Sequence, residues 1–565
     1  MITLRRIGNT VAPGIAALAA ALAVVVIALF SPRAVAETYY VRADGGSVEQ
    51  CDGKTDAAFR PSNNTAVLEC AWNHPFVALP PLGAPRIAGG DTLIIRRGSY
   101  AMGIGAPETD DCTAEDASNC IMPSIPSGPS KERPTRILGE GHDAGCPLPP
   151  ELWANGAVHT ILRLENSSNV EIACLELTDH SPCIKSHNRT GPAQGETSRC
   201  KFDAPPFGPW GASGIVAADS SDVVLRQLNI HGLATNGVHA GRLKDWTLVD
   251  VVIRANGWAG WDGNISHDDP IGSSNSGRIS FTGGEIAWNG CSERYPSTEI
   301  FGCWAQQQGG YGDGLGTAKT GGHWVFEGVN VHHNTSDGLD LLYMDGSGSV
   351  TIRRVRAEAN AGNQIKTAGP VLIENSILLG NCAFFTTFPT SNLTDDDHCR
   401  AMGNTLSVSH IGNSVATIRN NTLAGQGDCL LITVGGDRAA RTLVQNTAFV
   451  GGVEWSGGSQ GNSLTCGHHA EDSTAPVVFE RNLFWNLKGD QCPPGSVCDV
   501  DPLLSVPEYG RYDATPQVGS PLIDSAETIV DLDHDFYRKP RASHSKPDIG
   551  AIEVQTAEEL AQPPQ

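Results

Sequence analysis

Short stretches of alternating apolar and polar residues recur along the chain from about residue 222 onward. Each repeat has a β-branched stretch, a second apolar stretch and a turn marked by Asn, a pattern that predicts half-buried strands. Outside the first 36 residues, helical periodicity is limited to a short possibility near Glu558. The repeats are DVVLRQLNI from Asp222, DWTLVDVVIRAN from Asp245, GRISFTGGEIAWN from Gly277, HWVFEGVNVHHN from His323, SVTIRRVRAEAN from Ser349, PVLIENSILLGN from Pro370, ATIRNNTL from Ala416, TLVQNTAF from Thr442 and PVVFERNLFWN from Pro476.

Successive repeats start roughly 21 to 26 residues apart, or further where a loop is inserted, which is the signature of a parallel β-solenoid. Asparagines close five of the repeats at the equivalent place, where Asn tolerates a left-handed backbone and can bond to the next copy. They are Asn256, Asn289, Asn334, Asn360 and Asn381. We therefore predict an all-β fold, a right-handed parallel β-helix with N-terminal and C-terminal caps.

The predicted organisation has four parts. Residues 1–36 form a signal peptide, 37–150 an N-terminal cap and first coil with disulfide-bearing loops, 151–490 the β-helix with inserted loops, and 491–565 a C-terminal cap and tail. The leader has Arg5 and Arg6 before an apolar run and a small-residue cleavage site at Ala34–Ala36. An uncleaved membrane anchor is the alternative. After cleavage we expect no membrane association and a secreted or periplasmic monomer.

Sixteen cysteines follow the predicted cleavage site, and many occur as near neighbours that favour disulfides stapling single loops. These near neighbours are Cys51 and Cys70, Cys112 and Cys120, Cys183 and Cys200, Cys291 and Cys303, Cys382 and Cys399, and Cys492 and Cys498. Thiolate metal sites use closer Cys spacing, so an oxidising compartment is the better interpretation.

The composition limits which kinds of partner the protein can bind. The net charge of −23 and the absence of a Lys/Arg run argue against nucleic acid. The 64 glycines and few aromatic residues suit one turn-rich β array better than several ordinary domains. A polyanionic substrate would be repelled by this charge, so its site would need a local cation.

Candidate chemistry lies in the segment after each turn, where NGVH from Asn236, DGLG from Asp313, DGLD from Asp337 and NQIK from Asn363 fall in one column. Asp313 and Asp337 are one coil apart, and Lys366 is one coil beyond Asp340, so these side chains should stack at roughly 4.8 Å spacing. Stacked carboxylates need a counterion, and oxygen ligands select a hard cation such as Ca²⁺. The glycine after each Asp would let the backbone bend around the ion.

This arrangement suits β-elimination on a uronic acid, in which a base removes the proton α to the sugar carboxylate while Ca²⁺ stabilises the developing charge. A neutral Lys366 would be the base, with its pKa lowered by the cation and by burial. The predicted substrate is therefore an anionic polysaccharide.

The stretch from Asp313 to Asn381 resembles polysaccharide lyase family 9, the pectate lyases and their relatives. The matching motifs are GDGLGTAK from Gly312, NTSDGLDL from Asn334 and NQIKTAG from Asn363, with Ser336 where the family carries an acidic residue. The resemblance implies a Ca²⁺-dependent lyase in which Asp313, Asp337 and Asp340 bind calcium. It implies Lys366 as the Brønsted base and Lys319 as a substrate contact.

Two alternatives remain open. A hydrolase similar to the polygalacturonases could use paired aspartates such as Asp268 and Asp269. A non-catalytic surface rod could instead grip polysaccharide through exposed Trp258, Trp261 and Trp324, although Trp in repeats more often packs inside. In either enzyme, the insertions 291–310 and 382–399 are predicted to wall the cleft and set substrate choice.

Overall fold

The computed structural model describes part of the chain, namely residues 36–62, 66–184, 200–201, 205–265, 270–303, 312–381, 384–387, 403–456, 459–489, 492–541 and 545–555. The chain divides into two compact units, Met1–Glu37 and Thr38–Gln565, and the second contains the strands described below. Within the described ranges, no helix is both long enough and apolar enough to span a bilayer.

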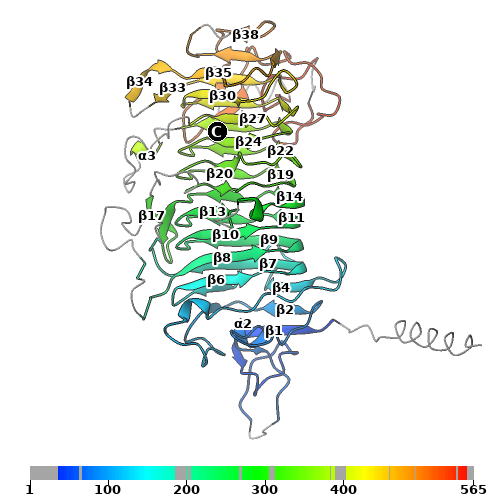
Figure 1. Ribbon diagram of the computed structural model, residues 1–565, viewed down its shortest axis with the longest axis vertical. Coiled ribbons are helices and arrows are strands. Elements are labelled where there is room, and N and C mark those ends of the chain that lie inside the picture. The colour runs from blue at the N-terminus through cyan, green and yellow to red at the C-terminus, as the bar shows by residue number, and fades with distance from the viewer. Residues whose placement is uncertain are drawn as a thin grey trace, which may run out of the picture. The chain divides into compact units, whose positions relative to one another are not determined.

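From β11 to β35, each coil contributes three strands, and each strand pairs in parallel with the equivalent strand of the next coil (Figure 1). In the coil before them, the single long strand β9 (Ser221–His231) pairs with both β11 and β12. One coil consists of β11 (Lys244–Val249), β12 (Val252–Arg254) and β13 (Ala259–Asp262). The next coil adds β14 (Ser276–Thr282), β15 (Glu285–Ala287) and β18 (Leu315–Gly316). The pairs β11–β14, β12–β15 and β13–β18 are all parallel, which confirms the predicted parallel β-helix.

The following coils repeat this plan. Their strands are β19 (His323–Glu327), β20 (Asn330–His332) and β21 (Leu339–Leu341); β22 (Ser349–Arg353), β23 (Arg356–Glu358) and β24 (Ile365–Ala368); β25 (Val371–Glu374), β26 (Ile377–Gly380) and β27 (Leu406–Ser409); β28 (Val415–Arg419), β29 (Thr422–Gly425) and β30 (Cys429–Val434); and β31 (Arg441–Gln445), β32 (Ala448–Gly451) and β35 (Cys466–Glu471). In the coils that end in β21, β24 and β27, the third strand follows the turn marked by Asn334, Asn360 or Asn381.

Parallel pairing begins well before the first sequence repeat. Strand β1 (Thr38–Gly46) pairs with β2 (Thr92–Ile95), which pairs with β4 (Thr135–Gly139). The third strands form their own sheet, which among the described residues has ten strands ordered β35-β30-β27-β24-β21-β18-β13-β10-β8-β6. Its first members are β6 (Val158–Arg163), β8 (Gly211–Ala218) and β10 (Asn236–Gly241).

Large aromatic side chains fill the interior of the middle coils. Trp246, Trp261 and Trp324 are each 0% exposed. The Trp261 ring lies 6.0 Å from Trp246 and 6.5 Å from Trp324, edge to face. Because Trp261 and Trp324 are part of the core, the hypothesis that they grip polysaccharide at the surface is wrong, and the alternation of their strands turns them inward.

An asparagine ladder runs through the interior from coil to coil. The Asn334 side-chain oxygen accepts bonds from the backbone N–H of Asn289 at 3.0 Å and from its Nδ2 at 2.9 Å, and Asn334 Nδ2 donates to Asn360 Oδ1 at 2.7 Å. Asn256 is bonded to Asn289 in the same way. The predicted bond to the neighbouring copy is thus confirmed for these four, and the Gln364 amide closes the ladder against Asn360.

Disulfides join five of the six predicted near-neighbour pairs, and the sixth, Cys382 and Cys399, falls outside the described residues. Two further bonds, Cys146–Cys174 and Cys429–Cys466, were not predicted. Cys429 of β30 and Cys466 of β35 are register partners, so this bond clamps two successive coils. The paired cysteines are 28 and 37 residues apart in the sequence, so they do not appear as near neighbours and were not predicted to pair.

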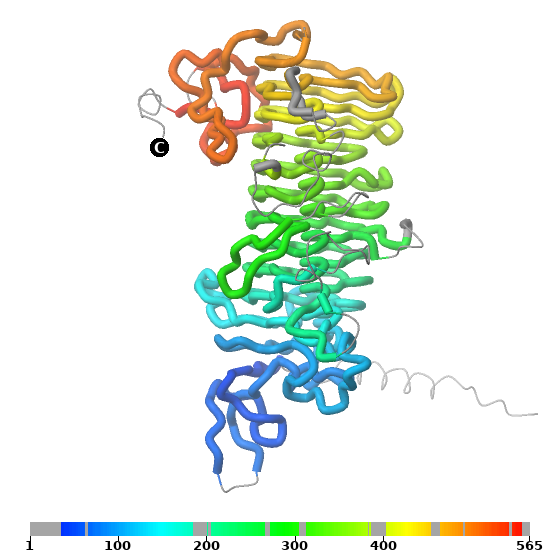
Figure 2. Tube along the Cα trace, turned by 90° about the vertical axis from the view of Figure 1, so that its left-hand side faces the viewer, coloured from blue at the N-terminus to red at the C-terminus, as the bar shows by residue number. Residues whose placement is uncertain are grey.

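The C-terminal segment lies beside the late coils (Figure 2). Asn375 and Asn420 on two successive coils donate to the backbone oxygens of His534 and Asp548. The buried Arg541 guanidinium donates to Asn375 Oδ1 at 2.6 Å and to the backbone oxygens of Gly550 and Ala551. Side-chain amides of the coils therefore tie the segment along the β-helix.

Candidate active site

Lys366 projects from the ten-stranded sheet beside two carboxylates. It is the register partner of Asp340 across β21 and β24, as predicted from their spacing. Its chain neighbours Ile365 and Thr367 are fully buried, whereas the Lys366 side chain is 24% exposed. Strand alternation thus turns Lys366 outward.

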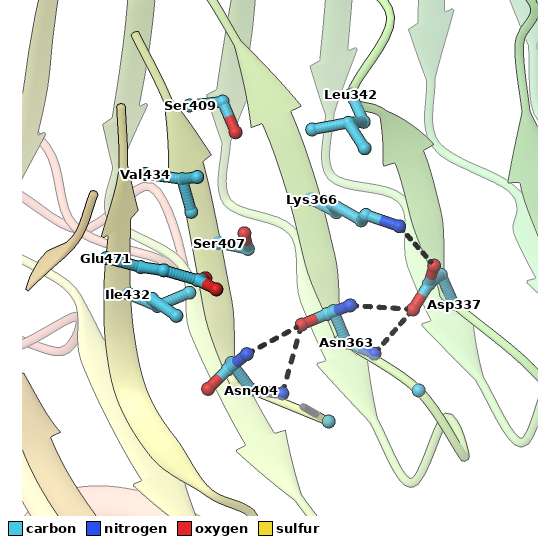
Figure 3. Close-up of a pocket in the computed structure, with 12 residues that line it drawn as sticks. Asp337, Leu342, Asn363, Lys366, Asn404, Ser407, Ser409, Ile432, Val434 and Glu471 are labelled. Atoms are coloured by element: carbon cyan, nitrogen blue, oxygen red, sulfur yellow. Dashed lines mark hydrogen bonds and ion pairs between the residues drawn. The ribbon is translucent and has the colours of Figure 1, made fainter. Parts of the chain in front are cut away.

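The Lys366 ammonium lies between two aspartates. Its Nζ is 3.2 Å from Asp337 Oδ2 and 3.1 Å from Asp340 Oδ2 (Figure 3 draws the first contact). Burial lowers the pKa of Lys366, but the charges of Asp337 and Asp340 raise it by more, so its pKa lies above the ordinary value. In this arrangement Lys366 carries a proton at neutral pH, in contrast to the neutral base that the sequence suggested.

Asp340 is a perturbed carboxyl group in this cluster. Burial, followed by the charge of Asp337, raises its pKa to about 6, against the opposing effect of Lys366. Its Oδ1 accepts the backbone N–H of Leu342 at 3.0 Å, and its Oδ2 faces Lys366. Asp340 can therefore gain or lose a proton near neutral pH.

Asp313 and Asp337 belong to a second, polar ladder next to this cluster. Asp313 Oδ1 accepts the backbone N–H of Asp337 at 3.0 Å. Asp337 Oδ1 accepts the N–H and Nδ2 of Asn363 at 2.6 and 2.9 Å, and Asn363 Oδ1 accepts the N–H of Asn404 at 3.0 Å (Figure 3). The stacking of Asp313 over Asp337 is as predicted, but one oxygen of each supports the fold.

The glycines after the aspartates make room for neighbouring coils. A Cβ on Gly338 would lie 2.4 Å from the backbone oxygen of Gln364 and 2.7 Å from Asn360 Nδ2. A Cβ on Gly314 would lie 2.5 Å from the backbone oxygen of Gly338. These glycines therefore permit close stacking of the coils beside the interior ladder. This packing explains why glycine follows each aspartate without requiring a bound ion.

A cavity of about 250 Å³ opens beside Lys366. The described residues that line it are Asp337, Leu342, Gly362, Asn363, Lys366, Gly403, Asn404, Ser407, Ser409, Ile432, Val434 and Glu471. The side of the cavity formed by β27, β30 and β35 was not predicted from the sequence, because these strands carry no motif. Ser407 and Ile432 are successive register partners of Lys366, but Ser407 lies 41 residues after Lys366 because of the insertion, so counting by coil length does not find it.

The remaining predicted residues lie apart from this cavity or outside the description. Lys319 is exposed in the turn after β18, and it does not line the cavity. Asp268 and Asp269 lie outside the described residues, as does most of the insertion 382–399. In the insertion 291–310, β16 (Cys291–Arg294) and β17 (Glu299–Cys303) form an antiparallel hairpin closed by Cys291–Cys303.

The predicted calcium ligands are brought only partly together. Asp337 Oδ2 and Asp340 Oδ2 converge on the point that Lys366 Nζ occupies, while Asp313 is engaged one rung away. Among the residues that the structure describes, no group of three or more His, Cys, Asp or Glu side chains is arranged to hold a metal ion. The described part of the protein thus brings two carboxylate oxygens, one from Asp337 and one from Asp340, to a single point.

No family model and no curated protein matches the sequence. Solved structures that resemble the chain include pectate lyase Pel9A, at 14% identity and a TM-score of 0.44 over 93% of this chain and 98% of that one. XylC in complex with xylose has 10% identity and a TM-score of 0.38 over 92% and 98%. A rhamnogalacturonan lyase has 12% identity and a TM-score of 0.28 over 79% and 87%. At these values the resemblance to lyase family 9 stays a prediction.

Proposed function

We propose that this chain is a polysaccharide lyase that cleaves an anionic, uronate-containing polymer by β-elimination. The observation that carries the proposal is the position of Lys366, which faces a cavity from the outer side of β24 with two carboxylates within 3.2 Å of its Nζ. An amine that faces a concave, hydroxyl-lined surface can lie close to the α proton of a bound uronate and can accept that proton once the amine is neutral.

In the proposed reaction, Lys366 Nζ accepts the proton from C5 of the uronate. The electron pair of that C–H bond forms the C4–C5 double bond, and the C4–O bond breaks with its electrons leaving on the glycosidic oxygen. That oxygen takes a proton from water, which completes the new chain end. The product carries an unsaturated uronate, which absorbs in the ultraviolet.

The lysine must lose its proton before it can act as a base. Asp337 and Asp340 oppose this step because they stabilise the ammonium form. A Ca²⁺ ion held by their convergent oxygens would neutralise the two carboxylates, bind the substrate carboxylate and lower the pKa of Lys366. Calcium dependence is therefore part of the proposal, with Asp337 and Asp340 as its principal protein ligands and Asp313 one rung away.

The test is ultraviolet absorbance on a panel of polyuronates, with EDTA and with added Ca²⁺, comparing wild type with Lys366→Arg. Arginine keeps the positive charge between Asp337 and Asp340 but does not deprotonate in proteins. We expect wild-type signal that needs Ca²⁺, and a loss of at least about 100-fold in the variant, the scale of general-base catalysis. An equally active Lys366→Arg variant would refute the role of Lys366.

A hydrolase is the second candidate, because the pKa of Asp340, raised to about 6, suits a general acid beside the carboxylate of Asp337. Hydrolysis leaves a new reducing end without an unsaturated sugar. In that case Lys366→Arg would retain reducing-sugar release, whereas Asp340→Asn would abolish it. The same panel, with both products measured, separates the two reactions.

We also propose that the protein acts in an oxidising compartment outside the cytoplasm. Seven disulfides join described cysteines, and no cysteine there is free. Disulfides at this density persist in secreted or periplasmic proteins. Cleavage after Ala36 and the monomeric state stay predictions, which N-terminal sequencing and light scattering of the exported protein would check.

A further inference from the structure

The cavity extends from Lys366 along the sheet toward β35. The register partners in the column of Lys366 are Ser407, Ile432 and His469. Two residues further along the strands, the partners of Ala368 are Ser409, Val434 and Glu471. Three rungs separate Lys366 from β35, a span of roughly 14 Å. This length accommodates more than the one sugar that faces Lys366.

The two halves of this cavity differ in chemistry. At one end Lys366, Asp337 and Asn363 are joined by hydrogen bonds and an ion pair. Beyond Lys366 the floor consists of the hydroxyl groups of Ser407 and Ser409 and the aliphatic side chains of Ile432 and Val434. Glu471 stands at the far end, with its carboxylate extended toward the strand that carries Ser407 (Figure 3).

Charge decides which sugar this second half can hold. Among the described lining residues, Lys366 is the only cation, and Asp337 and Asp340 already neutralise it. A sugar carboxylate placed over Ile432 and Val434 would lose water, gain no cation and face the negative charge of Glu471. An uncharged sugar avoids these costs, because it can lay an apolar face on Ile432 and Val434 and donate its hydroxyl groups to Glu471.

We propose that Ser407, Ser409, Ile432, Val434 and Glu471 form a subsite for an uncharged sugar next to the uronate at Lys366. The substrate is then a heteropolysaccharide in which uronate and neutral sugars alternate, rather than a polymer of uronate alone. This inference rests on the proposed function for the uronate position and deepens it by naming the class of polymer.

The test measures binding rather than turnover, in Lys366→Arg protein, by titration calorimetry. One pair of probes is an alternating galacturonate–rhamnose hexasaccharide and hexagalacturonate. The other pair is a hyaluronan hexasaccharide, which alternates glucuronate with N-acetylglucosamine, and an oligoglucuronate of equal length. We expect the alternating member of at least one pair to bind about tenfold more tightly. Tighter or equal binding of the homopolymer in both pairs would overturn the inference.

Glu471→Gln in the same background tests the carboxylate itself. Because Glu471 accepts sugar hydroxyls and repels carboxylates, its amide variant should bind the preferred alternating probe about tenfold more weakly and the homopolymer more tightly. Glu480→Gln is the matched control, since Glu480 is an exposed residue of β36 (Val477–Glu480) in the other sheet and the charge change is identical. An equal shift of preference in both variants would refute the role of Glu471.

Failure of this inference and failure of the proposed function are distinguishable. Preferential binding of an alternating probe without any unsaturated product from the wild-type protein would reject the lyase reaction and keep the subsite. Unsaturated product from homopolymers, with equal binding of both members of each pair, would keep the lyase and reject the subsite.

Discussion

Asp337 serves two purposes with its two carboxylate oxygens. Oδ1 accepts hydrogen bonds from Asn363 and continues the polar ladder, whereas Oδ2 faces the Lys366 ammonium. An amide oxygen could replace Oδ1 without loss, but only a carboxylate offers a charged Oδ2. Fold and chemistry can thus be separated at this single residue.

We predict that Asp337→Asn leaves stability within about 1 kcal/mol of wild type, because the ladder keeps its acceptor. The Ca²⁺ concentration needed for half-maximal activity should rise at least tenfold as one charged ligand is lost. Chemical denaturation and a calcium titration of the lyase signal measure the two effects. Asn363→Ala is the contrasting variant, expected to lose stability. Unchanged calcium dependence in Asp337→Asn would contradict its role as a ligand.

The raised pKa of Asp340 predicts how the stability of the folded protein depends on pH. Its folded-state pKa, about 6, lies above the value of 3.8 expected for an unfolded chain, so the folded protein binds this proton more tightly. The contribution to stability is therefore present below about pH 4 and is lost as pH rises toward 6. Asp340→Asn should remove this loss, which corresponds to about 3 kcal/mol.

The measurement is the apparent Tm of wild type and Asp340→Asn at acid and neutral pH in calcium-free buffer. The Tm of the variant should increase relative to that of wild type as pH rises through this range, and the two Tm values should be equal at the acid end. A constant difference in Tm across the window would show that Asp340 titrates at its ordinary pKa.

At the scale of single residues, sequence reasoning placed Lys366, Asp340, Asp337 and Asp313 in the correct relative register. It did so because one coil separates each pair, and a parallel ladder converts that separation into contact. It could not assign protonation, since the raised pKa of Lys366 depends on two atoms that lie within 3.2 Å of its Nζ. Lys319 stays a predicted contact on an exposed turn.

At the scale of elements, the interior asparagine ladder holds successive turns in register. Asn334 is 0% exposed, and it accepts from Asn289 and donates to Asn360 Oδ1 and to the backbone oxygen of Ile286. Removing this buried amide takes the acceptor from the backbone N–H of Asn289 and a donor from the backbone oxygen of Ile286, and each loss costs roughly 1 to 3 kcal/mol.

We predict that Asn334→Ala destabilises the protein by about 3 kcal/mol or more. The control is Asn119→Ala, because Asn119 is exposed and its side chain donates to nearby Asp116 within the same turn. Chemical denaturation followed by tryptophan fluorescence reports on the core, since Trp246, Trp261 and Trp324 pack inside the middle coils. Equal midpoints for the two variants would mean that the ladder contributes nothing to stability.

The elements around the site were predicted unevenly. The strands β21 and β24 carry recognisable motifs, whereas β27 and β30 read only as the apolar stretches LSVS and LLITV. Their place beside Lys366 follows from parallel pairing across an insertion, which sequence spacing obscures. Glu471 is similarly remote, more than one hundred residues from Lys366 yet lining the same cavity.

At the scale of the whole molecule, the net charge of −23 opposes any polyanionic substrate. Raising ionic strength from 0.01 to 0.15 M shortens the Debye length from about 30 Å to about 8 Å and screens this repulsion. We therefore predict that KM for a polyuronate falls severalfold over this range at saturating Ca²⁺. Steady-state kinetics with NaCl checks it, and a KM that rises with salt would show that local attraction outweighs the overall charge.

The all-β solenoid could be predicted for the whole molecule because its repeats are periodic and five of the nine close on an Asn at the equivalent place. The C-terminal segment was predicted as a cap, but its attachment along the late coils through Asn375, Asn420 and Arg541 was not. These contacts join residues more than 120 positions apart and follow no period, so one sequence contains no signal for them.

Because the stacked strands are evenly spaced, the cavity also fixes the distance between the two sugars that it binds. Every rung between Lys366 and the strand of Glu471 adds one strand spacing to the distance between the sugar that reacts and the sugar that is recognised. Backbone pairing is the same at each rung, so a whole repeat could be gained or lost without disturbing its neighbours. The spacing between cleavage point and recognised unit is therefore set in discrete steps by the architecture itself.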